Sequence, residues 1–278
     1  GRRVSFSDCR EGDVAILRSE VSKMVARLAR TSEQLQAEKT ALANALADIS
    51  HQIRTPLTAM SLLVPVAERA SDDQARRSAL RELESMVERV SWLVTALLKL
   101  ARIDAGVMAF EKRPVRVADV AVRALAPLEL SLDVHGVAWS VAVGGATFEG
   151  DAAWTVEALE NIVKNCAEAA GAGGSVRIEA TEDALATRIR VSDDGPGIAA
   201  EDLPHVFERF YRGRPDAAMR GGRAGDAAVR DEGAGSQGFG IGLSLAQALV
   251  SAQGGSLRAR NLAQGGACFE ITFPKMNV

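Results

Sequence analysis

The chain has 278 residues, of which 47% are hydrophobic and 25% are charged, and its formal net charge is −3. This length is enough for two domains with their own cores, and the mildly acidic balance argues against nucleic acid as the main partner. The three cysteines show no CxxC spacing, which indicates neither a disulfide framework nor a zinc site. No apolar run approaches the ~20 residues that a membrane-spanning helix needs.

Residues 13–106 are predicted to be helical almost throughout. Apolar residues follow a heptad spacing over 17–49, where eight of ten core positions are apolar, and again over 80–101. A break is expected at 70–73, where Ser71 or Asp72 could cap the second helix. Such a hairpin cannot bury both stripes alone, so we expect it to pair with a second copy as a four-helix bundle. A dimerising bundle without chemistry would explain the stripes equally well.

His51 lies in the first of these helices, within the segment SHQIRTPL at 50–57. Helical periodicity places it opposite the neighbouring isoleucines, so its imidazole is expected to face solvent. Thr55 follows one turn later and shares the exposed face. Pro56 lacks a backbone N–H, which is expected to kink or loosen the helix there. Taken alone, a histidine of this kind is more often a solvated surface residue than a reactive one.

After Gly106 the pattern changes to short strands and helices. Alternating segments predict a mixed sheet with helices on one face, an α/β sandwich. Gly144 and Gly145 separate the first two expected strands, which are predicted to form a hairpin. The expected strands are 139–143, 147–149, 175–180, 187–192, 256–260 and 268–273, and the expected helices are 151–169 and 241–251.

Two clusters in this half suggest a bound nucleotide. Asn161 and Asn165 share one helix face, and neutral oxygen ligands suit a Mg²⁺ whose charge phosphates already balance. Such a pair is also common as plain helix-surface polarity. Asp193 ends a strand and begins the sequence DDGPGI, where a carboxylate can accept from an amino group and glycines let the backbone approach a flat ring. The alternative for that segment is an ordinary tight turn.

Two more clusters follow in the sequence. The segment VFERFYRG at 206–213 combines aromatic and basic residues, although a loop anchored by aromatics has the same composition. The segment GFGIGL at 238–243 opens a helix with three glycines, which would present backbone N–H groups to phosphate. A single glycine-rich loop is a weak signal. Four such clusters in this order are a specific one.

Together these segments resemble the sensor histidine kinases of two-component signalling. SHQIRTPL is similar to their dimerisation and phosphotransfer domain, and ENIVKNCAEA at 160–169 with the three later clusters is similar to their ATP-binding domain. The resemblance implies an α+β fold, in which a helical-hairpin dimerisation domain (a four-helix bundle in the dimer) precedes an α/β-sandwich ATP-binding domain. It also implies a coiled-coil linker at 1–40, the hairpin domain at 41–106, a linker at 107–114 and the ATP-binding domain at 115–278.

The resemblance assigns roles to single residues. His51 would accept the γ-phosphoryl group of ATP and pass it to the receiver domain of a response regulator, and Thr55 would orient a water that dephosphorylates that regulator. Gln52 stands where many relatives have an acid, and it can hold the imidazole but cannot take its proton. The remaining residues would be Asn161 and Asn165 for Mg²⁺ and phosphates, Asp193, Gly195 and Gly197 for adenine, Arg212 for phosphate charge, and Gly238, Gly240 and Gly242 for the hinge of the nucleotide lid.

Three further expectations come with the resemblance. The stretch before His51 is similar to a membrane-proximal coiled coil, which implies transmembrane helices before Gly1 and a cytoplasmic location for this portion of a cell-membrane protein. Glu168 occupies a position where many relatives place a lysine near the phosphates. The lid between Gly213 and Gly238 is rich in glycine and alanine and is expected to be disordered without nucleotide.

Two alternatives are weaker. The ATP-binding fold also resembles that of type II topoisomerase ATPases, in which a glutamate four residues before the Mg²⁺ asparagine activates water. Asn161 stands at that position and is no general base, whereas the imidazole of His51 is a free nucleophile at neutral pH. A pure dimerisation module would need no glycine-rich lid.

Overall fold

The computed structural model describes residues 11–70, 72–213 and 239–275. The chain divides into two compact units, one ending at Leu62 and the other running from Leu63 to the C-terminus. The boundary falls inside the first helix, so the second unit contains the end of that helix, the second helix and the whole sheet-bearing region. The domain limits expected from the sequence remain predictions.

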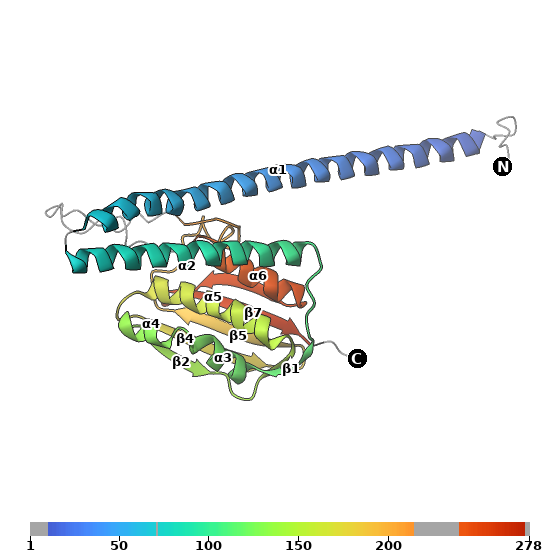
Figure 1. Cartoon of the computed structure of the whole chain (residues 1–278). Helices are drawn as coiled ribbons and strands as arrows, with labels where there is room; N and C mark the ends of the chain where they lie inside the picture. Colours follow the sequence, from blue (N-terminus) through green and yellow to red (C-terminus); the bar gives the residue numbers. More distant parts are fainter. Residues whose placement is uncertain (1–10, 71, 214–238, 276–278) are drawn as a thin grey trace. The chain divides into compact units, whose positions relative to one another are not determined.

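Two long helices occupy the N-terminal part of the chain (Figure 1). Helix α1 spans Glu11–Arg69 and continues without interruption through Pro56. Helix α2 spans Asp73–Asp104 and begins at the predicted break, because the Asp72 side chain accepts hydrogen bonds from Gln74 N (3.2 Å) and Ala75 N (3.3 Å). Among the described residues, no helix is long and apolar enough to cross a membrane.

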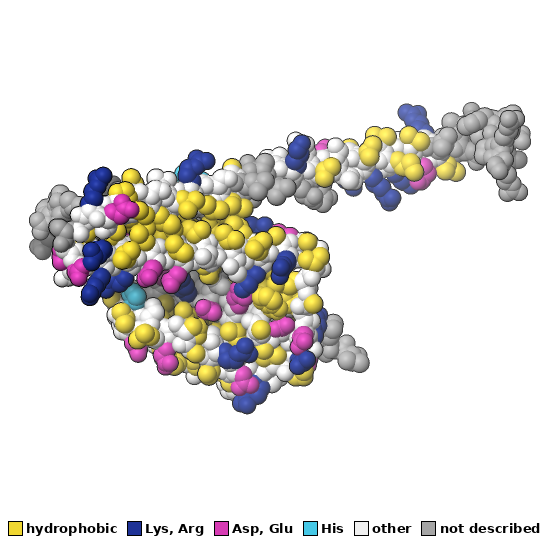
Figure 2. Space-filling model, viewed as in Figure 1, with side chains coloured by type: hydrophobic (Ala, Val, Ile, Leu, Met, Phe, Trp, Pro, Cys, Tyr) yellow, Lys and Arg dark blue, Asp and Glu magenta, His cyan; other side chains and the backbone are white. Residues whose placement is uncertain are grey.

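Helix α2 has two apolar faces with different surroundings. Leu93, Ala96 and Leu100 are buried, and their part of the helix packs on α6 (Gly242–Ala252). Val87 and Val94, which belong to the predicted dimer stripe, keep 53% and 41% of their surface exposed. Apolar side chains gather over α2 in the view of Figure 2. The second face is therefore available for a partner.

The rest of the second unit is a five-stranded sheet with helices on one face. The strand order is β2-β4-β5-β7-β6, in which β2 and β4 are parallel and the other neighbours are antiparallel. A separate antiparallel pair joins β1 and β3. The strands are β1 (Arg113–Arg116), β2 (Ala138–Ala142), β3 (Thr147–Gly150), β4 (Ser175–Glu182), β5 (Ala186–Asp193), β6 (Ser256–Asn261) and β7 (Ala267–Pro274).

Helices α3 (Val117–Leu125), α4 (Glu129–Val134), α5 (Ala152–Ala170) and α6 lie on the same side of this sheet (Figure 1). Buried side chains alternate along β5, where Ile189 and Val191 face the helices. Arg190, between them, faces the other way and pairs with Glu270 at 2.6 Å. The α/β sandwich expected from the sequence is confirmed.

The predicted hairpin around Gly144 and Gly145 is wrong. Both strands exist, but β2 pairs with β4 and β3 pairs with β1, so they belong to different sheets. The two glycines form a turn that carries the chain from one sheet to the other. The turn residues suited a hairpin, but the hydrogen-bonding partners of each strand come from distant segments.

Candidate nucleotide and phosphotransfer site

The segment around His51 matches its predicted exposure. His51 and Thr55 are both exposed, while Ile53 between them is half-buried. The Thr55 hydroxyl donates to the His51 carbonyl oxygen at 3.2 Å, which holds the two residues in one turn of α1. Gln52, next to His51, is half-buried. The imidazole is thus presented on the surface of a helix with a hydroxyl one turn away.

Asp193 ends β5 and is 4% exposed. Its Oδ1 accepts from Gly195 N at 3.0 Å and from Ala267 N at 3.2 Å. Its Oδ2 is buried and accepts no hydrogen bond from an N–H or O–H group in the described part of the chain, and the weakly donating thiol of Cys166 is its neighbour. A buried carboxylate oxygen without a donor is costly unless a ligand supplies one. This atom therefore fits the predicted role of Asp193 as the reader of an amino group.

The Cys166 thiol on α5 lies beside this carboxylate. Burial, followed by the negative charge of Asp193, raises the pKa of the Cys166 thiol well above its usual value. The thiol consequently stays protonated at neutral pH, and it is a poor nucleophile. Cys166 forms part of the wall behind Asp193.

Both glycines of the DDGPGI segment are held close to other parts of the fold. A Cβ on Gly195 would lie 2.5 Å from the backbone oxygen of Ala169 on α5. Gly197 has φ +80°, and a Cβ there would lie 2.9 Å from Asn261 Oδ1. Any larger residue at these two positions would require a rearrangement, because the loop backbone passes close to Ala169 and Asn261.

Sequence reasoning missed the supports of this loop. The Asn261 side chain accepts from Ile198 N at 2.8 Å and donates to Ile198 O at 2.6 Å, which clamps the end of the loop. A Cβ on Gly266 would overlap the backbone oxygen of Asp193. Gly265 and Gly266 after β6 indicate that another backbone segment passes close by, but the sequence does not show which segment it is.

Asn161 connects α5 with the start of α6. Its Nδ2 donates to Glu157 O at 2.8 Å, and its Oδ1 would lie 3.0 Å from a Cβ on Gly242, the first residue of α6. Ile241 precedes α6, and its side chain does not cap the first N–H groups of this helix. Asn165 is half-buried one turn further along α5. Of the predicted phosphate-binding residues, Asn161 and Gly242 therefore lie side by side at the start of α6.

The two flanks of the predicted lid meet at its base. Phe210 N donates to Gly240 O at 2.9 Å, and both residues have positive φ, 65° and 70°. A Cβ on Gly240 would lie 2.7 Å from Tyr211 O. Arg212 is exposed just beyond this junction. Gly238 and the predicted lid at 214–237 lie outside the described residues.

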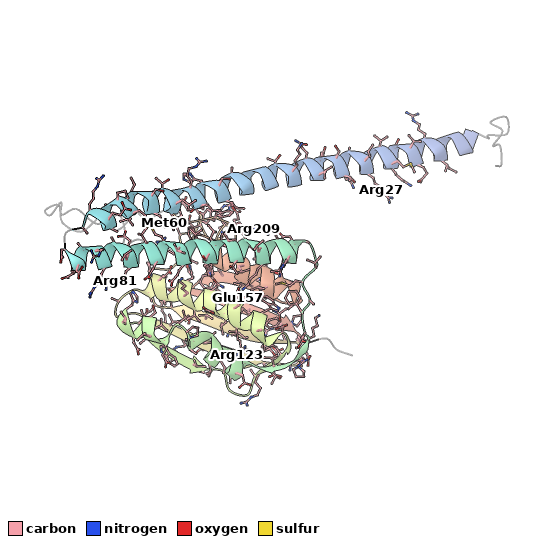
Figure 3. All side chains as sticks on the ribbon, in the orientation of Figure 1. Arg27, Met60, Arg81, Arg123, Glu157 and Arg209 are labelled. Atoms are coloured by element: carbon pink, nitrogen blue, oxygen red, sulfur yellow. The ribbon has the colours of Figure 1, made fainter. Side chains whose placement is uncertain are left out.

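Helix α2 contacts both flanks of the lid. Trp92 stacks on Phe239 with ring centroids 6.4 Å apart. Arg209, labelled in Figure 3, donates twice to the carboxylate of Asp104 at the end of α2, at 2.9 and 2.7 Å. Lys99 pairs with Glu157 of α5 at 2.6 Å. These contacts place α2 against the nucleotide-binding region within the second unit.

Two carboxyl groups on α5 have raised pKa values. Burial, then the charge of Glu157, raises the pKa of Glu160, against the opposing effect of Lys164. Burial also raises the pKa of Glu168, and Lys164 and Arg212 oppose it. Glu168 is nevertheless an exposed residue, so the protein surrounds its carboxyl group only in part and solvent still reaches it.

Comparisons with known proteins agree with this geometry. The family described as "Histidine kinase-, DNA gyrase B-, and HSP90-like ATPase" matches residues 150–277, and the family described as "His Kinase A (phospho-acceptor) domain" matches residues 41–106. A phospho-acceptor domain is thus followed by an ATPase domain, which is the order expected from the sequence.

Similar whole proteins come from several bacteria. The probable sensor histidine kinase TcrY of Mycobacterium tuberculosis is 31% identical over 88% of this chain and 48% of its own length. The kinase/phosphatase MprB of Mycobacterium ulcerans is 32% identical over 86% of this chain and 46% of its own length. The chain therefore spans about half the length of these two relatives.

Solved structures share the fold. The Acinetobacter baumannii histidine kinase AdeS aligns with a TM-score of 0.62 at 20% identity, over 82% of this chain and 98% of that one. The histidine kinase ThkA, solved in complex with the response regulator TrrA, aligns with a TM-score of 0.64 at 17% identity, over 87% of this chain and 64% of that one.

Proposed function

Because the chain belongs to the sensor histidine kinases, we propose that it transfers the γ-phosphoryl group of ATP to His51 and from there to an aspartate of a response regulator. The observation that carries the proposal is the buried Asp193 carboxylate, which has one oxygen fixed by two backbone N–H groups and the other left for a ligand. An adenine amino group is a donor of the kind that this oxygen lacks.

The residues around Asn161 fit a magnesium nucleotide. The amides of Asn161 and Asn165 offer neutral oxygens, and the uncapped start of α6 offers N–H groups to phosphate. Mg²⁺, when bound, would neutralise phosphate charge. Arg212 would add a cation near the same end of the nucleotide. Phosphoryl transfer needs mainly such positioning and charge neutralisation.

The acceptor side of the reaction is carried by α1. A ring nitrogen of His51 forms a bond to the γ-phosphorus while the bond to the bridging oxygen breaks, and ADP leaves with that electron pair. The Gln52 carbonyl oxygen can accept a hydrogen bond from the other ring N–H and so hold the ring. The proton of the phosphorylated imidazole is released to water, because an amide is no base.

Labelling with ATP that carries a radioactive γ-phosphate tests the proposal. The whole chain with Mg²⁺ should acquire label that is lost in acid and kept in base, as phosphohistidine is. His51→Ala should remove the label, whereas His135→Ala should keep it, because His135 is the exposed residue that follows α4 and its ring bonds to Ser131 of the same turn. Acid-stable label, or label on His51→Ala, would refute the assignment.

We further propose that the chain dephosphorylates its response regulator. Thr55 lies one turn from His51 on the same exposed face, where its hydroxyl could orient a water. Thr55→Ala should therefore lower phosphatase activity and leave labelling of His51 largely intact. Full phosphatase activity in this variant would contradict the role of Thr55.

An ATPase is the second candidate, because the matched ATPase family includes DNA gyrase B-like proteins. Steady ATP hydrolysis without labelled His51 would favour it.

Homodimer formation and attachment to a membrane are further proposals from the sequence. The dimer draws support from the exposed apolar stripe of α2.

A further inference from the structure

Strand β2 forms one open edge of the five-stranded sheet (Figure 1). Its strand partner in the described part of the chain is β4, and β6 forms the other edge. All five residues of β2 are exposed, including Trp139 at 38% and Val141 at 36%. An edge strand presents a row of backbone N–H and C=O groups that can pair with another strand. This edge is therefore a place where a further strand can add to the sheet.

The backbone groups that face the open edge belong to Trp139 and Val141. Ala138 N donates to Gly174 O at 2.9 Å, which shows that the backbone groups of Ala138 point towards β4. This direction alternates from one residue to the next along a strand, so Ser140 also points towards β4. Trp139 and Val141, which lie between them and beyond, point the other way. Each chain thus offers the N–H and C=O groups of two residues at this edge.

The two edges of the sheet differ in charge. Residues 137–143 have the sequence VAWSVAV, which contains no charged side chain. Strand β6 carries the exposed residues Arg258 and Arg260, and charged side chains on an edge strand protect it against pairing. Strand β2 lacks this protection. An acidic or basic segment would find no opposite charge on β2, whereas a second β2 strand brings no charge that would be repelled.

We propose that β2 pairs antiparallel with β2 of a second copy of this chain, about a two-fold axis at Ser140. In this register, Trp139 of each copy lies opposite Val141 of the other, and the residues of each pair exchange both backbone hydrogen bonds. An aromatic side chain opposite a β-branched one is a favourable cross-strand pair. The two Ser140 residues face each other as a pair without mutual backbone hydrogen bonds.

This contact is small and lies apart from the apolar stripe of α2. Two five-residue strands cover far less than the roughly 1,200 Å² of a standard stable interface, so the pairing alone is weak. It goes beyond the proposed function, because it involves neither the ATP site nor His51. A chain that dimerises through α2 and also pairs through β2 forms assemblies whose mass increases with concentration.

Disulfide trapping on the whole chain tests the register. Directly opposite residues of a pair without mutual hydrogen bonds have Cα atoms about 4.5 Å apart, which a disulfide can span. Ser140→Cys should therefore link two chains under mild oxidation. Ser256→Cys, at an exposed position of β6, is the matched control and should link far fewer. Both are made together with Cys9→Ser, because the other cysteines, Cys166 and Cys268, are buried. Equal linking by the two variants would overturn the proposal.

Charges at position 140 test whether the second strand comes from the same chain. Ser140 is exposed, so Ser140→Lys and Ser140→Glu should both fold. Each variant alone places like charges directly opposite each other, which should weaken the pairing by about fivefold. An equimolar mixture of the two variants places opposite charges there and should restore it. Sedimentation of the whole chain over a range of concentrations measures the change.

Three outcomes of the sedimentation experiment would overturn the proposal. The first is a mass of the unaltered chain that stays constant with concentration, and the second is association that neither charged variant weakens. The third is association that both variants lose and the mixture does not restore, which would mean that β2 pairs with a different segment. Ser256→Lys should associate as the unaltered chain does. Calorimetry should show that Ser140→Lys still binds ATP, so this inference and the proposed function can fail separately.

Discussion

Asp193 and Asp194 are adjacent acids whose carboxylates have different partners. Both oxygens of Asp194 are held by Ser175, through its backbone N–H and its hydroxyl, each at 2.7 Å. These bonds lower the pKa of the Asp194 carboxyl. Asp193 instead has one oxygen fixed and one free of described partners. The sequence DDGPGI predicted the position of the site, but it did not show that Asp194 bonds Ser175 while Asp193 keeps one oxygen for a ligand.

Asp193→Asn should weaken ATP binding by about 1.5–3 kcal/mol, because a charge-assisted hydrogen bond to the base is replaced by a neutral one. Calorimetry with Mg²⁺ measures the change. Asp194→Asn is the control, since its carboxylate bonds Ser175, and it should alter ATP affinity much less. Equal affinities for Asp193→Asn and the unaltered chain would remove Asp193 from the site.

Gln52→Glu should speed the labelling of His51. A carboxylate beside the imidazole can take the proton that the amide cannot, and general-base help is typically worth 10²–10⁴-fold. Imidazole is already a competent nucleophile, so a gain of about tenfold is expected. Initial rates at saturating Mg-ATP provide the measurement. An unchanged rate would mean that the proton leaves directly to water even when a base is present.

At the scale of elements, the periodic segments were predictable and their pairing was not. The break before α2 and its cap at Asp72 were expected from local residues, and so were α5 and α6. The pairing of the strands was not predictable, because β2 pairs with β4, which lies more than thirty positions away in the sequence. Asn261 was missing from the predicted site for the same reason, because its hydrogen-bond partner Ile198 lies 63 residues away in the sequence.

Asn261→Ala should reduce both stability and nucleotide affinity. Two hydrogen bonds to the Ile198 backbone disappear, which should cost about 1–2 kcal/mol of unfolding free energy. The loop that carries Asp193 should then hold its geometry less well, so ATP should bind more weakly. Denaturant unfolding and calorimetry separate the two effects. Arg260→Ala, one residue earlier on the same strand, should preserve ATP affinity.

The β4–β5 turn should contribute a pH-dependent stability. Hydrogen bonds from Arg188, Ala186 and Leu185 lower the pKa of Asp183 from 3.8 to about 2. A folded-state pKa below the unfolded value stabilises the fold above the unfolded pKa, and this contribution is lost as the pH falls towards about 2. Asp183→Asn should thus be less stable than the unaltered chain at pH 6 but not near pH 2. A pH-independent difference between the two would contradict this linkage.

At the scale of the whole molecule, the chain leaves an apolar stripe on α2 without cover from its second unit. Val87 and Val94 belong to it, together with Leu80, which is 48% exposed. Covering a side chain of this size completely is worth about 1.5–3 kcal/mol, so several of them can stabilise a dimer. The heptad pattern of the sequence predicted this face, and nothing in a single chain could show what covers it.

Replacing Val87 and Val94 together with lysine should convert the chain to monomers. Two charges would be placed in an interface that depends on apolar contact. Light scattering measures the mass, and circular dichroism shows whether the helices persist. Ser85→Lys, on a different exposed face of α2, should remain dimeric. A dimer that survives the double substitution would place the interface elsewhere.

The junction between Phe210 and Gly240 has a consequence for how such proteins diverge. Phe210 and Gly240, which flank residues 214–238 in the sequence, are joined by a backbone hydrogen bond. The entropy cost of closing a loop grows only slowly with length, by about 0.6 kcal/mol for each doubling. Insertions and deletions between the two flanks should therefore be nearly neutral for folding. Natural selection can vary the length of this segment while the sheet beneath it stays the same.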